Sequence, residues 1–264
     1  MLVSHNELVA AVNKAFLGMR RSCGEADVIA NMVADLQMVG LHGVRHFNNA
    51  SRYISHDQDR PADITLTQPQ RISVNLHHCS LACHLPVIMD YAIEKMIGSK
   101  SMTIELNHCH NRWLAYSELV KLASKGIACM ARWTNGSSPK HTMYILNRGC
   151  VAPELFLSDA LDIQDTNNHS NHSNHSNHSN HSNHSNHSNH SMIIELSVQD
   201  FDVTALSRDY SLHIDSNELS QAQQNAWHNG ISVDDQEWGL LKQTATAILV
   251  ENSEQSVKGA GEVA

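Results

Sequence analysis

Three amphipathic helices are predicted near the start of the chain. Ser4 and Glu7 have the Ser-x-x-Glu spacing of a capping box, so the first helix is expected to begin near His5. Its apolar face comprises Leu8, Val12, Ala15 and Phe16. Apolar residues at helical spacing predict a second helix from about Glu25 to Val39 and a third over Gly43–Ile54.

The pattern then alternates between strands and helices. Pro61 and Pro69 favour extended or turning backbone, because proline is excluded from helix interiors. Strands are predicted over Ile72–Leu76, Met102–Leu106 and Ile127–Trp133, and helices over Leu85–Ile97 and Leu114–Ser124. Farther along, an edge or continuing strand is predicted over Met192–Val198, and helices over Ser216–Trp227 and Asp234–Leu249. The predicted fold class is α/β: a helical N-terminal region, alternating strands and helices, and a helical C-terminal segment.

A low-complexity tract divides the chain. The triplet Asn-His-Ser occurs eight times between Asn168 and Ser191, with no apolar residue to bury. Such a segment cannot recover the entropy lost on ordering, so it is interpreted as a flexible insert. Three regions follow: 1–158 is helical plus α/β, 159–191 is the disordered repeat, and 192–264 holds a strand and the C-terminal helices. The tract histidines form either a metal-chelating arm or a tolerated surface-loop expansion.

Charge and composition exclude several classes of protein. The formal net charge is −9 with no basic stripe, which argues against a nucleic-acid partner, and aromatic residues are only 5% of the chain. No stretch approaches the roughly 18 apolar residues of a membrane span, and the start lacks the features of a secretion signal. A cytoplasmic bacterial protein without membrane contact is expected.

Two clusters of soft and borderline ligands stand out. Six cysteines lie in the first 150 residues and are expected to stay reduced, as buried thiols or ligands. One cluster comprises His77, His78, Cys79, Cys83 and His84; the other comprises His108, Cys109 and His110. Together they could supply four zinc ligands, or the cysteines could pack in the core while the histidines solvate loops. Because no Cys-x-x-Cys pair is present, no metal site is predicted.

The common enzyme motifs are missing. The chain has no glycine-rich phosphate loop, Gly-x-Ser-x-Gly elbow or His-Glu-x-x-His helix. His42 precedes Gly43 between two predicted helices, where it could exchange protons in a cleft or simply mark a helix boundary.

Several segments together resemble the malate/L-lactate dehydrogenase family, which includes diketogulonate and ureidoglycolate dehydrogenases. They are Leu41–Phe47, Gln68–Ile72, Asn107–His110, Ala131–Asn135 and the tail segment Asn229–Trp238. The two ends of the chain resemble an uncharacterised bacterial family of unknown function, a likeness that implies no activity. They are Val3–Glu7, Val250–Ser256 and Gly259–Gly261.

The resemblance implies roles for individual residues. In the dehydrogenases the histidine of Ser-His-Gly-Val is the acid/base at the 2-hydroxy or 2-keto carbon, which implies this role for His42. Further catalytic positions fall on His110 and Tyr116. The arginine that binds the substrate carboxylate corresponds to His46, with Arg45 displaced by one, so these two are the implied substrate-binding residues. The serine before the catalytic histidine is replaced by leucine.

Three hypotheses follow. The family's long central region, which supplies most of the nicotinamide-cofactor site, has no counterpart between Cys150 and Met192, so no cofactor is expected. A non-catalytic or accessory relative of NAD(P)-dependent dehydrogenases is therefore predicted, with a homo-oligomer or a partner protein left open and its small-molecule ligand unknown. The alternatives are an active NAD(P)-dependent 2-hydroxyacid oxidoreductase and a His/Cys metal-binding protein.

Overall fold

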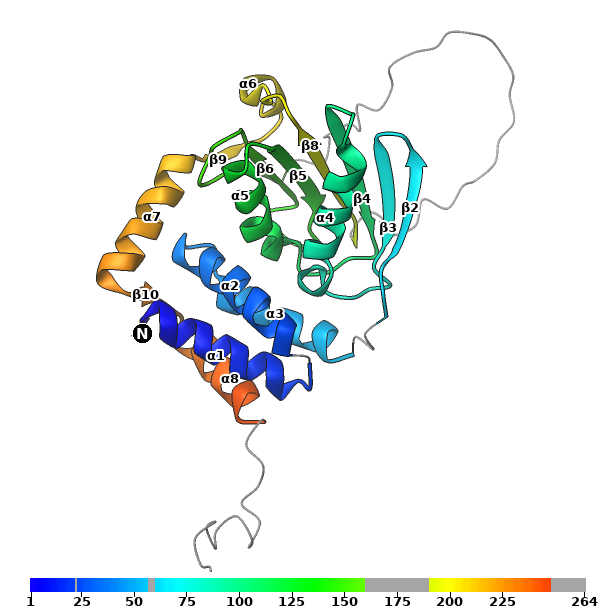
Figure 1. The fold of residues 1–264 in the computed structure, drawn as a ribbon. Helices are drawn as coiled ribbons and strands as arrows, with labels where there is room; N and C mark the ends of the chain where they lie inside the picture. The colour runs from blue at the N-terminus through cyan, green and yellow to red at the C-terminus, as the bar shows by residue number, and fades with distance from the viewer. Residues whose placement is uncertain (22, 57–59, 160–189, 248–264) are drawn as a thin grey trace, which may run out of the picture.

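The computed structural model describes residues 1–21, 23–56, 60–159 and 190–247 (Figure 1). The helices are α1 His5–Gly18, α2 Cys23–Met38, α3 Gly43–His56, α4 Leu85–Met96, α5 Tyr116–Ser124, α6 Val203–Leu206, α7 Ser216–Asn229 and α8 Asp235–Thr246, with 3-10 turns η1 Leu81–Cys83 and η2 Arg112–Ala115. The strands are β1 Leu2–Val3, β2 Asp63–Gln68, β3 Arg71–Asn75, β4 Ser101–Asn107, β5 Ala128–Thr134, β6 His141–Leu146, β7 Glu154–Ser158, β8 Met192–Ser197, β9 Leu212–Ile214 and β10 Ile231–Ser232.

The N-terminal helices confirm the sequence prediction. The Ser4 hydroxyl accepts a hydrogen bond from the Glu7 amide at 3.2 Å, which caps α1 at its first turn. The predicted apolar face of α1 is fully buried. Since α2 and α3 also lie where apolar spacing placed them, the helical layer follows directly from local patterning.

The central sheet has the order β2-β3-β4-β8-β5-β6-β7-β9 in the described part of the chain. Among the described strands of this sheet, only β3 and β4 pair in parallel, and the other pairs are antiparallel. The strand predicted over Met192–Val198 is confirmed as β8, which lies between β4 and β5 and not at the edge of the sheet. Residues 192, 194 and 196 are buried and alternate with half-buried ones, the pattern of an interior strand with one face on the core.

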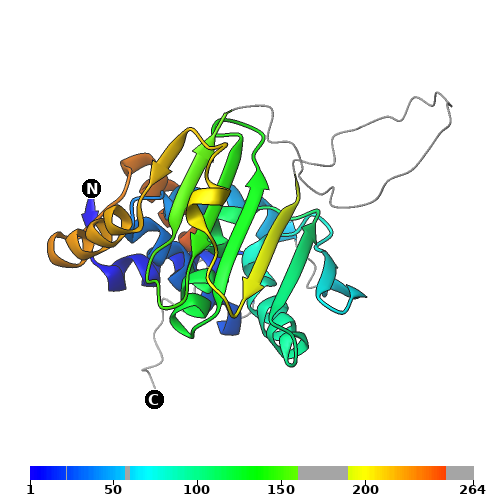
Figure 2. The same ribbon diagram turned by 90° about the horizontal axis from the view of Figure 1, so that it is seen from above.

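Helices cover one face of this sheet, and most of the hydrophobic core lies between them (Figure 2). On the other face the segment containing α6 covers a smaller cluster, in which Phe201 and Val203 pack against Met130 and Phe156. The described helices are not long and apolar enough to cross a membrane.

The two ends of the described chain are joined. β1 pairs with β10, with Leu2 opposite Ser232 and Val3 opposite Ile231. α1 and α8 lie side by side in Figure 1. The segment after the Asn-His-Ser tract therefore completes both the sheet and the helical layer. The tract itself, predicted as a flexible insert, lies outside the described residues except for its last two.

Candidate functional site

His42 lies at the junction of α2 and α3, in a left-handed conformation with φ of 54°. The next residue, Gly43, packs directly against the backbone of α2. A Cβ atom at Gly43 would lie 2.1 Å from the Val33 carbonyl oxygen and 2.8 Å from the Gln37 amide nitrogen. The glycine of the His-Gly pair is thus required by backbone packing. The His42 side chain beside it is exposed.

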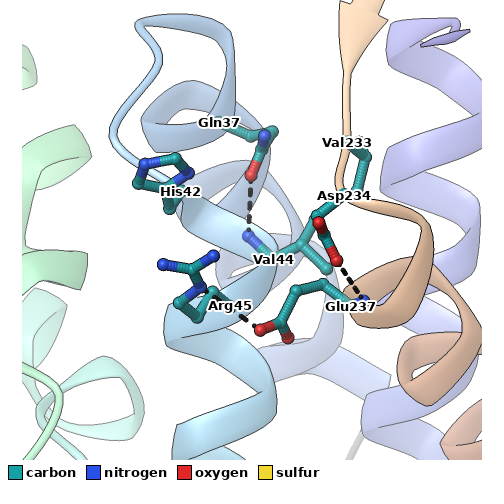
Figure 3. A pocket seen from close by; sticks show the side chains of 7 residues that line it. All are labelled: Gln37, His42, Val44, Arg45, Val233, Asp234 and Glu237. Carbon is teal, nitrogen blue, oxygen red and sulfur yellow. Dashed lines mark hydrogen bonds and ion pairs between the residues drawn. The ribbon is translucent and has the colours of Figure 1, made fainter. Parts of the chain in front are cut away.

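A small hollow opens beside His42. Its lining comprises Gln37, His42, Val44, Arg45, Val233, Asp234 and Glu237 (Figure 3). The space is about 180 Å³, including part that opens to solvent. Small-molecule sites usually enclose roughly 300–1,000 Å³, so this hollow is too small for a dinucleotide.

Gln37 holds the back of the hollow together. Its side-chain oxygen accepts a hydrogen bond from the Val44 amide at 3.0 Å, and its side-chain nitrogen donates one to the Ser232 carbonyl at 2.7 Å. One glutamine therefore joins α2, the first turn of α3 and β10. The C-terminal segment is fixed against the His-Gly junction by these two bonds.

The front of the hollow is acidic. Arg45 Nε lies 3.2 Å from Glu237 Oε1, an ion pair at the start of α8. Asp234 caps that helix by accepting hydrogen bonds from the amides of Gln236 and Glu237, and the Glu237 amide is the main reason that the pKa of Asp234 is lowered. Two carboxylates thus face one guanidinium that is already paired.

His46 lies one turn farther along α3, and its side chain is half-buried. Its ring stacks on Trp113 with centroids 5.3 Å apart. Burial, and next the nearby His42 and Arg45, lower the pKa of His46 to about 4. His46 is therefore a neutral imidazole at physiological pH and cannot serve as a cationic anchor for a carboxylate.

His110 lies at the far end of α3. Its ring stacks on Tyr53 with centroids 3.8 Å apart. Gly43 and Tyr53 are separated by ten residues of helix, or about 15 Å along the axis. His110 does not line the hollow at His42. The structure therefore does not bring the two histidines implied by resemblance to one hollow.

Tyr116 is placed in the core rather than at either histidine. It begins α5 and packs against Tyr144, with ring centroids 6.0 Å apart. Burial, and then the nearby Asp35, raise the pKa of its hydroxyl. A phenol whose pKa is raised in this way stays protonated and is part of the packed interior.

Members of the two predicted ligand clusters lie close together at the ends of neighbouring strands of the central sheet. His78 follows β3, and His108 and His110 follow β4, at the carboxyl ends of the parallel pair. The His78 ring centroid lies 4.8 Å from that of His108 and 5.8 Å from that of His110. His190 precedes β8 at the same edge, 4.6 Å from His110 and 6.0 Å from His78. These four residues are called the histidine cluster below.

The other members of the predicted clusters are placed elsewhere. Cys79 and Cys109 are buried, and burial raises the pKa of Cys109 to about 11, which keeps it a thiol. His77 Nε2 lies 2.8 Å from Asp63 Oδ2, on β2. As the side chains stand, the described residues contain no group of three or more His, Cys, Asp or Glu that could hold a metal ion.

The sequence analysis did not identify several residues of the hollow beside His42 and of the histidine cluster. Asp234 and Glu237 reach the hollow only because β1 pairs with β10, a contact that local pattern does not show. The Asp234-x-x-Glu237 spacing at the start of a helix is a capping signal and could have marked the turn. The sequence gives no signal that distinguishes His190 from the seven earlier histidines of the identical Asn-His-Ser triplets.

The fold is that of the malate/lactate-type dehydrogenases. The chain is similar to a dehydrogenase from Sinorhizobium meliloti, at 10% identity and a TM-score of 0.68 over 93% of this chain and 99% of the other. It is also similar to malate dehydrogenase from Pyrococcus horikoshii, at 10% identity and a TM-score of 0.66 over 95% of this chain and 96% of the other. Sulfolactate dehydrogenase from Methanocaldococcus jannaschii matches at 9% identity and a TM-score of 0.63, over 93% and 97%.

Residues 3–75 match the model of a protein family of unknown function, DUF3726. No curated protein sequence matches the chain. Both predicted resemblances are thus confirmed, one by family model and one by fold. The alignments extend over nearly all of each neighbouring chain and do not single out a missing central region. The case for or against hydride transfer therefore depends on the residues at the site.

Proposed function

We propose that this chain is a non-catalytic relative of the malate/lactate-type dehydrogenases, acting as a binding or accessory protein. The observation that carries the proposal is the state of His46. It stands where the resemblance implies a cationic residue for the substrate carboxylate, and it is a half-buried imidazole whose pKa is lowered to about 4, chiefly by desolvation. A neutral ring supplies none of the charge that would hold a 2-hydroxy or 2-keto acid.

The neighbouring arginine does not replace that charge. Arg45 is paired with Glu237, and Asp234 lies on the same wall of the hollow. An incoming carboxylate would have to displace Glu237 and would meet the repulsion of Asp234. The arrangement around His42 favours a closed contact between α3 and α8 over an anionic substrate.

The residues around His42 do not fit a nicotinamide dinucleotide either. The hollow of about 180 Å³ is too small, and its two carboxylates oppose a pyrophosphate. The chain also has no glycine-rich phosphate loop. The His42 side chain is exposed, but an acid/base residue alone does not transfer a hydride.

A binding titration tests this proposal. NADH and NADPH are added separately to the full chain, and the melting temperature and the nucleotide fluorescence are followed. The proposal predicts no saturable change with either nucleotide, since a ligand that binds only the native state must raise the melting temperature by mass action. Saturable stabilisation, together with nucleotide oxidation in the presence of 2-keto acids, would establish the active oxidoreductase instead.

A further inference from the structure

The segment after the Asn-His-Ser tract fills a gap in the sheet formed by the chain before it. Residues 1–159 are called the N-terminal part below, and residues 190–247 the C-terminal part. β8 of the C-terminal part pairs antiparallel with β4 on one side and with β5 on the other, in register over six residues each time. Among the described strands, β4 and β5 are joined only through β8. The N-terminal part thus offers two facing strand edges, whose backbone groups are satisfied by one added strand.

The C-terminal part is bound a second time, in the helical layer. α8 lies against α1 and α3, and β10 pairs with β1 (Figure 1). Two side-chain amides of the N-terminal part hold the backbone there. Gln37 Nε2 donates a hydrogen bond to the Ser232 carbonyl at 2.7 Å, and Asn48 Nδ2 donates one to the Glu237 carbonyl at 2.9 Å. Two separate contacts, one in each layer, therefore fix both the position and the direction of the C-terminal part.

The apolar side chains of the C-terminal part are buried against the N-terminal part. In the described chain, all of its buried apolar residues belong to the core cluster that both parts share. They are Met192, Ile194, Leu196, Leu219, Ile231, Val233, Trp238 and Leu241. On the opposite face of the sheet, Phe201 and Val203 pack against Met130 and Phe156. Burial of apolar surface is the main favourable term in most protein association, and here it comes from contact between the two parts.

Charge also distinguishes the two parts. The N-terminal part has 15 Lys and Arg against 13 Asp and Glu, whereas the C-terminal part has two against nine, so their formal charges are +2 and −7. Three ion pairs cross between the parts: Arg45–Glu237 at 3.2 Å, Arg132–Glu195 at 3.6 Å and Arg148–Asp200 at 3.0 Å. The Arg148 amide also donates a hydrogen bond to Asp200 Oδ1 at 3.0 Å. Opposite net charges favour this pairing over the association of either part with itself.

We propose that the N-terminal part is a binding site for an acidic segment that supplies one strand and a terminal helix, and that the C-terminal part occupies this site as a separate partner would. Strand pairing, apolar burial and ion pairs hold the two parts together, so the peptide connection between residues 159 and 190 is not required. A chain cut between these residues therefore stays one folded complex with one copy of each part. This holds whether or not the proposed function is correct.

The test cuts the folded full chain. A protease recognition site replaces residues 171–177, and the purified chain is cleaved under native conditions. Gel filtration and native mass spectrometry should find both pieces in one species that elutes with the uncut chain, and hydrogen exchange should show that the β8 amides stay protected. The melting temperature of the cut chain should rise with protein concentration, because its unfolding also separates two molecules, whereas that of the uncut chain should not. Pieces that separate or precipitate after cleavage overturn the proposal.

Matched variants of the cut chain test the role of charge. Arg148→Gln removes an ion pair that crosses between the parts, and it should raise the Kd of the two pieces by about two- to fivefold. Arg71→Gln is the control: its ion pair with Glu105, at 2.6 Å, lies within the N-terminal part, so the Kd should not change. Both values are read from the concentration dependence of the melting temperature. Equal Kd values in the two variants would contradict an interface that depends on charge.

Discussion

The two ends of α3 differ in what surrounds their histidines. At the first end, His42 lines a hollow in which Arg45 is paired with Glu237, and Gln37 is hydrogen-bonded to Val44 and Ser232. At the other end, His110 lies among three more imidazoles, from the segments flanking β3, β4 and β8. The first end has the form of a structural joint, whereas the second gathers four imidazole rings. The shared fold alone therefore does not say which chemistry either end supports.

The sharpest way to break the idea of a structural joint is Gly43→Ala. A Cβ there would meet the Val33 carbonyl oxygen at 2.1 Å, and backbone cannot yield as a flexible side chain can. We expect a loss of more than about 3 kcal/mol in the free energy of unfolding, measured by chemical denaturation. Gly24→Ala is the control: nothing lies within 4 Å of its added Cβ, and it should be neutral or slightly stabilising. Equal stability of Gly43→Ala and the wild type would contradict the packing described.

The neutral state of His46 predicts how stability depends on pH. Its pKa falls from 6.5 in the unfolded chain to about 4 in the fold, so only the unfolded state gains a proton between these values. Stability is complete above pH 6.5 and is lost as the pH falls toward 4, by about 3 kcal/mol from this residue. His46→Phe keeps a ring against Trp113 and should flatten the curve by that amount.

Denaturation midpoints between pH 7 and pH 4.5 measure this effect, with the exposed His228→Gln as control. The control should follow the wild-type curve. If the stability of His46→Phe also followed the wild-type pH curve, the pKa of His46 would not be lowered in the fold. His46 would then again be a candidate to bind a substrate carboxylate.

A smaller effect is expected from Gln37→Met. This change keeps the volume but removes the acceptor for the buried Val44 amide and the donor to Ser232. Leaving a buried amide unpaired costs about 2 kcal/mol. Equilibrium unfolding measures the loss, and hydrogen exchange should show earlier opening of β10 than of the central sheet. Unchanged protection of β10 would mean that Gln37 does not join the C-terminal segment to α3.

The smallest effect concerns the ion pair. Arg45 is half exposed, so Glu237→Gln should change the free energy of unfolding by less than about 1 kcal/mol. The same variant sharpens the functional comparison, because it removes one of the two carboxylates that oppose an anion. If Glu237→Gln gained measurable binding of a 2-keto acid while His46 stayed neutral, Arg45 rather than His46 would be the substrate-binding residue.

Local pattern predicted the parts of the fold that depend on local interactions. The Ser4 cap and the buried face of α1 could be read from spacing alone, and so could most helices and strands between residues 72 and 133. The place of β8 between β4 and β5 could not, because alternation shows which face is buried but not which strand lies alongside. β6 and β7 were also missed, although β6 is almost entirely buried. A short strand that is buried on both faces shows no alternation to detect.

The candidate sites divide in the same way. The sequence pointed to His42, His46 and His110, which lie beside the two ends of α3. Six non-glycine residues of the described chain have a left-handed backbone, and four of these are His42, His77, His78 and His108. Their partners were not found, since Glu237 and His190 come from segments far away in sequence. Burial was also invisible beforehand, and burial is what turns His46 from a candidate anchor into a neutral ring.

The most direct test of the central claim follows the hydride itself. The full chain is incubated with NADPH or NADH deuterated at either face of C4 and with a panel of 2-keto acids, and the 2-hydroxy acids formed are analysed by mass spectrometry. We predict no deuterium in any product beyond the level found with His42→Asn, which keeps a residue suited to the left-handed backbone but lacks the imidazole. Deuterium transfer by the wild type that His42→Asn abolishes would show an active dehydrogenase and contradict the claim.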